Sequence, residues 1–189
     1  TAWVEHIARH KPVYPGVRSL AVSQNRLNEK ALFDRLGIPA AAWRRIESAA
    51  DLDLAVAALG LPLVIKTVTG GYDGKGQFVI RDTADVAKAW KELGTSAPLM
   101  AEAFVRFQRE LSMVAVRGQD GEVRCYPPAW NVHHQGILSH SIVPAPGLDE
   151  HRAREAEDYI RAILQDLQHV GVMTLEMFDT GSGLVANET

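Results

Sequence analysis

The sequence has few of the features that mark secreted, membrane-spanning or nucleic-acid-binding proteins. Its 189 residues include one cysteine, Cys125, so an intramolecular disulfide is excluded and a reducing compartment is favoured. No apolar run approaches the roughly 20 residues of a transmembrane helix, and the first residues lack the pattern of a signal peptide. The formal net charge of −3 gives no basic footprint for nucleic acid. We therefore expect a cytosolic protein that binds neither membrane nor nucleic acid.

Two common phosphate-binding motifs are also missing. The P-loop requires Gly-x-x-x-x-Gly-Lys-[Ser/Thr], but the pair Gly74-Lys75 is preceded by Thr69 five positions earlier and is followed by Gly76. The dinucleotide fingerprint needs a helix directly after its glycines, whereas residues 77–80 are strand-like. Any phosphate site in this chain must therefore use a different arrangement.

The most informative stretch that is present covers residues 63–81. Two short apolar runs, 63–65 and 78–80, bracket a segment with four glycines in seven positions (Gly70, Gly71, Gly74 and Gly76), which predicts a strand, a loop and a strand. Glycine lets the backbone turn sharply, so that consecutive N–H groups can form a concave anion site, and flanking lysines add positive charge. The loop therefore favours a polyphosphate ligand, and the alternative is a long flexible hairpin with no ligand.

Periodicity and turn residues place the remaining elements. Helices are expected at 23–36, 48–59, 82–93 and 148–167, with a helical turn at 3–8. Strands are expected at 40–46, 63–66, 78–80, 99–102, 110–117, 122–126, 128–132, 137–143, 171–178 and 184–186. The longest helix has one predicted buried stripe, formed by Ala156, Ile160, Ile163, Leu164 and Leu167.

Two carboxylates on the last predicted hairpin form a candidate metal site. Glu176 lies inside an apolar strand, and Glu188 follows the next strand after a tight turn, so the two can face one another. Carboxylates placed this way repel unless a divalent cation relieves them, and oxygen ligands suit Mg²⁺ bridging to phosphates. The alternative is a surface pair that flanks a hairpin.

Other candidate residues are ambiguous when taken singly. Lys66 ends a buried strand, where an ammonium needs an anion, either a phosphate or a carboxylate such as Glu110. Arg26 alone would be a solvated residue of a helix face. His133 and His134 are more often structural, and they lack the cysteine partners or His-x-x-x-His helix of a zinc site.

Taken together, the motifs resemble a known family. The matching segments, in chain order, are Thr69-Gly-Gly-Tyr-Asp-Gly-Lys-Gly-Gln77, Glu102-Ala-Phe-Val105, Arg109-Glu-Leu-Ser112, Asn131-Val-His133, Gly136-Ile-Leu138, Gly171-Val172 and Asn187-Glu188. They resemble the ATP-grasp core of the N5-carboxyaminoimidazole ribonucleotide synthetase family, from about Ser23 to the last residue. The Tyr72-Asp73 pair is specific for this branch, because other ATP-grasp ligases vary at both positions.

The resemblance implies a role for each matching residue. ATP phosphates would be held by Arg26 and Lys66 and covered by Gly71, Tyr72, Asp73, Gly74, Lys75, Gly76 and Gln77. Adenine would be read by the backbone of Glu102, Ala103, Phe104 and Val105, while Glu110 would take the ribose hydroxyls and His133 would lie against the nucleotide. Mg²⁺ would be bound by Glu176 and Glu188, with Asn187 assisting. The catalytic residues Tyr72, Asp73 and Lys75 would face the ribonucleotide and bicarbonate.

The reaction that the resemblance implies has two steps and is part of purine biosynthesis. ATP phosphorylates bicarbonate to carboxyphosphate, and the exocyclic amine of aminoimidazole ribonucleotide then captures the carboxyl group. Many relatives carry Arg where this chain has Lys75, so a bidentate contact becomes a point charge. Two alternatives stay open: another ATP-grasp ligase, such as the formate-using glycinamide ribonucleotide transformylase, and a nucleotide-binding module without catalysis. The Tyr72-Asp73 pair argues against the transformylase.

The expected fold is α+β, an ATP-grasp fold with ATP between two subdomains. We expect a small subdomain at 23–98 that carries the glycine hairpin and a large one at 99–189 with an antiparallel sheet, while 1–22 form a remnant or linker from an N-terminal α/β domain. The family continues beyond the Asn-Glu motif, so we expect an excised core that binds nucleotide weakly and does not carboxylate alone. Family members are commonly homodimers.

Overall fold

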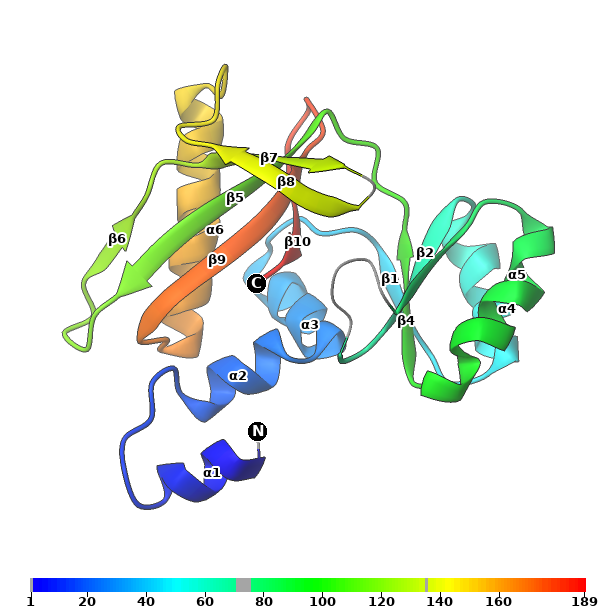
Figure 1. Ribbon diagram of the computed structural model, residues 1–189, viewed down its shortest axis with the longest axis horizontal. Coiled ribbons are helices and arrows are strands. Elements are labelled where there is room, and N and C mark those ends of the chain that lie inside the picture. The colour runs from blue at the N-terminus through cyan, green and yellow to red at the C-terminus, as the bar shows by residue number, and fades with distance from the viewer. Residues whose placement is uncertain (1, 71–75, 135) are drawn as a thin grey trace.

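The structure is a computed structural model that describes residues 2–70, 76–134 and 136–189, and it contains two β-sheets with helices packed against them (Figure 1). The helices are α1 (Ala2–Ala8), α2 (Val17–Ser23), α3 (Arg26–Leu36), α4 (Ala49–Leu59), α5 (Thr83–Leu93), the short 3₁₀ helix η1 (Gly94–Ser96) and α6 (Glu150–Leu167). The strands are β1 (Trp43–Ile46), β2 (Leu63–Thr67), β3 (Gln77–Ile80), β4 (Leu99–Ala103), β5 (Arg109–Arg117), β6 (Val123–Cys125), β7 (Ala129–His134), β8 (Ile137–Ile142), β9 (Gly171–Asp179) and β10 (Leu184–Glu188). The predicted α+β class is confirmed.

The smaller sheet has four antiparallel strands in the order β1-β4-β2-β3. β2 and β3 form the predicted glycine hairpin, in register from Leu63 opposite Ile80 to Lys66 opposite Gln77. Helices α4 and α5 cover one face of the sheet, on the right in Figure 1. Their apolar side chains form one core with those of the strands, which includes Leu52, Ile65 and Ala89.

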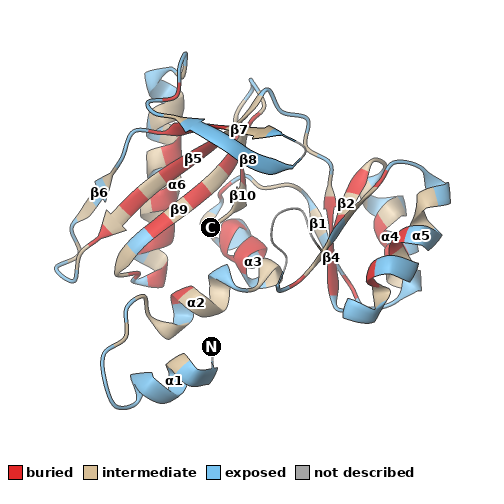
Figure 2. Ribbon diagram, in the orientation of Figure 1, coloured by how far each residue is buried: buried red, intermediate tan, exposed pale blue. Residues whose placement is uncertain are grey.

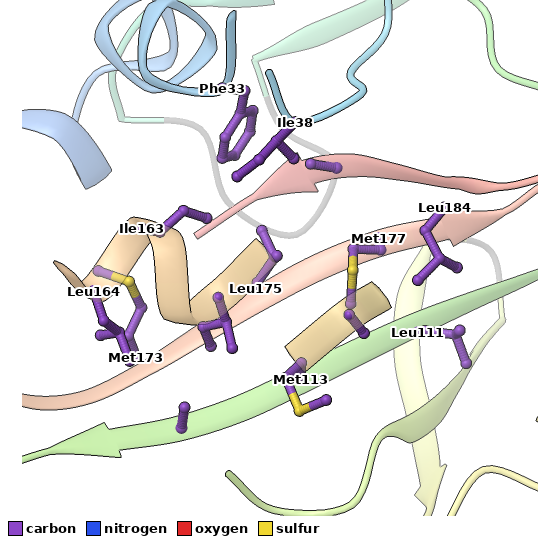
Figure 3. Close-up of a cluster of buried hydrophobic side chains, with 14 of the residues drawn as sticks. Phe33, Ile38, Leu111, Met113, Ile163, Leu164, Met173, Leu175, Met177 and Leu184 are labelled. Atoms are coloured by element: carbon purple, nitrogen blue, oxygen red, sulfur yellow. The ribbon is translucent and has the colours of Figure 1, made fainter. Parts of the chain in front are cut away.

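The larger sheet has six strands, in the order β10-β9-β5-β7-β8, with β6 paired to β5. Helix α6 packs on one face, and its buried residues are the five predicted for its apolar stripe, Ala156, Ile160, Ile163, Leu164 and Leu167. Helix α3 adds Leu32 and Phe33 to the same core, and Figure 3 shows Phe33 and Ile38 above β9 and β10. Along β5 and β9 every second residue belongs to the core, so Ser112 and Glu176, which are paired and lie between core residues, are on the opposite face.

Helix ends follow the capping side chains. Helix α3 begins at Arg26 and not at Ser23, because the Asn25 side chain accepts hydrogen bonds from the backbone N–H groups of Leu27 and Asn28. It ends at Gly37, which has a positive φ of 67° that favours glycine. Ser48 and Asp82 cap α4 and α5 in the same way, as expected from the sequence.

The pairing of strands differs from the predicted division at residue 98. Strand β4 pairs with both β1 and β2 and thus belongs to the smaller sheet, although we placed it in the second subdomain. Helix α3, which we placed in the first subdomain, packs against the larger sheet through Leu32 and Phe33. Strands that pair in one sheet can lie far apart in the sequence. A single boundary at residue 98 therefore cannot separate the two sheets.

Residues 1–22, expected to be a remnant or linker, carry helices α1 and most of α2. The guanidinium of Arg18 on α2 donates to both the backbone oxygen and the side chain of Asp166 on α6, at 2.5 and 2.7 Å. Helix α1 is mostly exposed, whereas the buried residues follow β5, β9, α6 and α3 (Figure 2). Within the described ranges, no helix has both the length and the hydrophobicity needed to cross a membrane.

Candidate functional site

A pocket lies between the two sheets and is lined by residues from both. We call it the inter-sheet pocket; it has an empty volume of about 410 Å³ that opens to solvent. Its lining residues are Lys30, Ala41, Val64, Lys66, Glu102, Ala103, Phe104, Val105, Phe107, Phe178, Ala186 and Asn187. The wall is largely apolar, and its charged side chains come from Lys30, Lys66 and Glu102, which gather on one side.

These three charges form one cluster, which we call the lysine cluster. The two carboxylate oxygens of Glu102 on β4 lie 2.7 Å from Lys30 Nζ and 2.6 Å from Lys66 Nζ. The Lys30 and Glu102 side chains are nearly inaccessible, at 2% and 5% exposed, whereas Lys66 keeps 16%. Burial alone would raise the pKa of Glu102, but the two ammonium groups outweigh burial and hold the pKa below its ordinary value.

The cluster identifies the anion expected beside Lys66 and adds one residue to the site. We expected Lys66 to meet a phosphate or a carboxylate such as Glu110, and the carboxylate it meets is Glu102. In the sequence, Glu102 was singled out only for its backbone. Lys30 was not singled out at all, since a lysine beside a glutamate on a helix is ordinarily exposed.

The segment that follows β4 presents backbone groups to the pocket. The N–H groups of Ala103 and Phe104 donate to the carbonyl oxygens of Ala42 and Pro62, at 2.9 and 3.3 Å. In the part of the chain that the structure describes, the N–H of Val105 makes no such hydrogen bond. Val105 can therefore offer its N–H to a planar ligand edge, and Phe107 and Phe178, whose rings stack 4.6 Å apart, extend the apolar wall beside it.

The last hairpin brings the two predicted carboxylates face to face. Glu176 on β9 is directly opposite Glu188 on β10, across a register shift between Ala186 and Glu188. Burial raises the pKa of Glu176, and the charges of Glu188 and Glu110 raise it further. The opposing cation nearest to Glu188 is the Arg26 guanidinium, whose Nη2 is 3.6 Å from Glu188 Oε2. Glu176 and Glu188 thus face and repel one another, as the sequence predicted.

Glu110 and His133 lie together on neighbouring strands. His133 Nδ1 is 3.2 Å from Glu110 Oε1, and both side chains are about one quarter exposed. Burial raises the pKa of Glu110, although His133 acts to lower it. Across residues 2–70, 76–134 and 136–189, no group of three or more His, Cys, Asp or Glu side chains is arranged to hold a metal by itself. Glu176 and Glu188 would therefore supply only part of the oxygen ligands of a metal bound between them.

A second, more open pocket lies beside the start of the glycine loop. Its lining residues are Ser23, Gln24, Arg26, Glu29, Val68, Thr69, Gly70 and Glu188. Arg26 Nη1 donates to the carbonyl oxygen of Thr67 at 3.1 Å, so the arginine is held between the hairpin and Glu188. The Glu29 carboxylate, which the sequence did not single out, accepts from Thr189 N and Oγ1 at 2.6 and 2.7 Å. Burial raises its pKa to about 7.

Part of the predicted glycine loop lies outside the described residues. This holds for Gly71, Tyr72, Asp73, Gly74 and Lys75, which include all three residues predicted to be catalytic. Gly76 accepts a hydrogen bond from Thr67 N at 2.8 Å, and Gln77 is the first residue of β3. The two ends of the loop are thereby placed next to Arg26 and Lys66.

Comparison with known proteins gives consistent results. The model of the ATP-grasp domain matches residues 31–189. An N5-carboxyaminoimidazole ribonucleotide synthase from Pseudomonas aeruginosa is 47% identical over 189 residues, which is 98% of this chain and 50% of that protein. The solved ADP complex of an N5-carboxyaminoimidazole ribonucleotide synthetase superposes with a TM-score of 0.92 at 37% identity, covering 98% of this chain and 49% of the other.

A third relative has been solved with two ligands. It is the N5-carboxyaminoimidazole synthase of Aspergillus clavatus in complex with ADP and 5-aminoimidazole ribonucleotide, with a TM-score of 0.88 and 27% identity over 97% of this chain and 48% of the other. The chain spans about half the length of the curated relatives that it matches.

Proposed function

The chain belongs to the ATP-grasp family, and we propose that it is the nucleotide-binding core of an enzyme that carboxylates 5-aminoimidazole ribonucleotide at the expense of ATP. The relatives named above carry this activity in their names, and one of them binds ADP together with the ribonucleotide. The observation that carries the proposal is the inter-sheet pocket itself. It has a lysine cluster on one side and a pair of facing carboxylates close to the other.

We propose that ATP lies in the inter-sheet pocket with its adenine against the backbone of residues 102–105. The apolar wall formed by Val64, Phe104 and Phe178 suits a flat ring, and the free N–H of Val105 suits a ring nitrogen. The phosphates would extend toward Lys66 and Arg26, below the glycine loop. Glu110 would take the ribose hydroxyls, with His133 beside it.

Glu176 and Glu188 would hold Mg²⁺ against the phosphates, with Asn187 assisting. The two carboxylates and the phosphate oxygens together supply the oxygen ligands that this ion prefers. The ion would supply charge neutralisation for the transferring phosphoryl group. The residues of this chain would orient the phosphates, and the closed loop would exclude water.

The proposed reaction makes two bonds and breaks three, in two steps. An oxygen of bicarbonate bonds to the γ-phosphorus of ATP as the bond to ADP breaks, which gives carboxyphosphate. The exocyclic amine of aminoimidazole ribonucleotide then bonds to the carboxyl carbon, phosphate leaves and the amine loses a proton. Tyr72, Asp73 and Lys75 would face these two substrates. We also propose that the full-length enzyme is a homodimer and is cytosolic.

The test measures the release of ADP by the full-length protein that contains residues 1–189. We expect release to require bicarbonate and aminoimidazole ribonucleotide together, and to be lost in Glu188→Gln but kept in Glu92→Gln, an exposed carboxylate of α5. Release with formate and glycinamide ribonucleotide instead would assign the chain to a different ligase. ATP binding with no ADP release under either condition would leave only a nucleotide-binding module.

A further inference from the structure

Lys30 on α3 is one of the largest fully buried side chains among the described residues, although lysine is ordinarily exposed. An ammonium without solvent is costly unless every proton finds an acceptor. Its Nζ donates to Glu102 Oε1 on β4 and to the Asn187 carbonyl oxygen on β10, both at 2.7 Å. Lys30 therefore contacts one strand of each sheet, and both residues that it contacts line the inter-sheet pocket.

The position of Lys30 is fixed by its own helix. Arg26 and Glu29, which precede it by four and one residues on α3, contact Glu188 and Thr189. Three side chains of one helix thus reach three consecutive residues of the β10 end, which holds α3 against the strand. Lys30 Nζ also lies 5.6 Å from the centroid of the Phe33 ring, within the range of a cation–π contact.

The charge balance of the lysine cluster depends on Lys30. Two ammonium groups and one carboxylate leave a formal charge of +1. Without Lys30, Glu102 and Lys66 would form a neutral pair, 2.6 Å apart. Lys66 is the more exposed member, so the surplus positive charge is presented at the surface of the pocket.

We propose that Lys30 is a positioning residue for the nucleotide phosphates: by neutralising Glu102 from behind, it leaves the charge of Lys66 free to attract the phosphates. This inference rests on the proposed function, since it assumes that the inter-sheet pocket takes a nucleotide. Lys30 itself does not touch the phosphates. It acts through Glu102, and an opposite charge held in a poorly solvated pocket acts more strongly than one in water.

The test compares ATP with adenosine, which lacks the phosphates. Dissociation constants of both ligands are measured by calorimetry without Mg²⁺, so that only the lysine cluster acts on the phosphates. We expect Lys30→Met, which keeps the length of the side chain, to lower the preference for ATP over adenosine about tenfold. Lys88→Met, on the exposed face of α5, changes the net charge equally and should leave the preference unchanged.

Two further variants separate charge from packing. Lys30→Arg keeps the charge and should restore most of the preference. The double variant Lys30→Met/Glu102→Gln removes both members of the pair and leaves Lys66 with its charge, so its preference for ATP should also recover. If Lys30 acts only by packing, the double variant will bind no better than Lys30→Met, and that result would overturn the inference.

The remaining outcomes are also distinct. An unchanged preference in Lys30→Met, with measurable ATP binding by the wild type, defeats the role of Lys30 and leaves the proposed function intact. Absence of ATP binding by the folded wild-type chain, with and without Mg²⁺, defeats the proposed function and the inference with it.

Discussion

On the side of the pocket formed by β2 and β4, the lysine cluster gives each of its buried charges a partner of opposite sign, whereas on the side formed by β9 and β10 two carboxylates face each other. The pKa of Glu102 is accordingly held low, and that of Glu176 is raised. The carboxylate of the first side is thus neutralised without a ligand and one positive charge is left over, whereas the second side would be stabilised by a cation. Under the proposed function, the first side would bind the phosphates through a fixed charge and the second would hold the metal.

The largest expected effect comes from removing the carboxylate at the centre of the lysine cluster. Glu102→Gln leaves two ammonium groups without their carboxylate, and we expect a loss of about 3–5 kcal/mol in the free energy of unfolding, measured with urea. The matched control is Glu47→Gln, in an exposed ion pair with Arg45 at the same 2.6 Å distance. It should cost less than about 1 kcal/mol. Equal losses in both variants would contradict the role of burial.

The next effect is a dependence of stability on pH that arises from Glu29. Its pKa rises from an ordinary 4.5 to about 7 in the folded chain. The folded state then binds more protons than the unfolded state, so stability falls as pH rises through this window, by roughly 3 kcal/mol. Glu29→Gln should remove that fall in urea unfolding from pH 4 to 8.

The control for Glu29 is Glu92→Gln, which changes an exposed carboxylate of α5. Its free energy of unfolding should fall with rising pH as steeply as that of the wild-type chain. If the free energy of unfolding of Glu29→Gln falls between pH 4 and 8 as steeply as that of the wild type, another group titrates in this range.

A smaller effect is expected for Lys66→Met on nucleotide binding. The variant removes a charged donor from the phosphates, and we expect ATP to bind about 10- to 100-fold more weakly in calorimetry. Glu102 keeps Lys30 as its partner, so the folded chain should lose little stability. A large fall in the melting temperature of the ligand-free variant, with ATP affinity unchanged, would show that Lys66 is structural.

The smallest effect concerns the carboxylate side. Glu176→Gln relieves the repulsion from Glu188, so the ligand-free chain should gain up to about 1 kcal/mol of stability at pH 8. The same change should reduce the gain in ATP affinity that Mg²⁺ provides. Glu5→Gln on the exposed helix α1 should do neither. A stability loss in Glu176→Gln would show that Glu176 is already compensated by a cation.

Much of the fold could be predicted because its signals are local. The glycine hairpin, the capped helices α4 and α5 and the buried stripe of α6 each follow from periodicity and end residues that lie close together in the sequence. The facing of Glu176 and Glu188 was also predicted from the tight connection between β9 and β10, although the exact pairing depends on the register shift between Ala186 and Glu188, which the sequence does not indicate. The place of β4 could not be predicted, because it depends on pairing with strands whose partner residues lie 32 or more positions away in the chain, as Thr67 does from Leu99.

The lysine cluster shows the same limit within the site. Lys66 was correctly expected to need an anion, but the choice of Glu102 over Glu110 depends on the neighbouring position of β2 and β4. Lys30 carries no local signal, since its burial arises only when α3 packs between the two sheets. The roles of Arg26, Glu110 and His133 came from the family resemblance and stay predictions.

The central claim, that a nucleotide binds between the lysine cluster and the facing carboxylates, is tested most directly by thermal unfolding of this chain during titration with ATP and Mg²⁺. Wild type, Lys66→Ala and Glu188→Ala are compared, with Lys88→Ala as the control on α5. Because a ligand that binds only the folded state raises the melting temperature, the account predicts a concentration-dependent rise in the wild type and control that is lost in the other two variants. No rise in the wild type at millimolar ATP, or an equal rise in all four proteins, would contradict it.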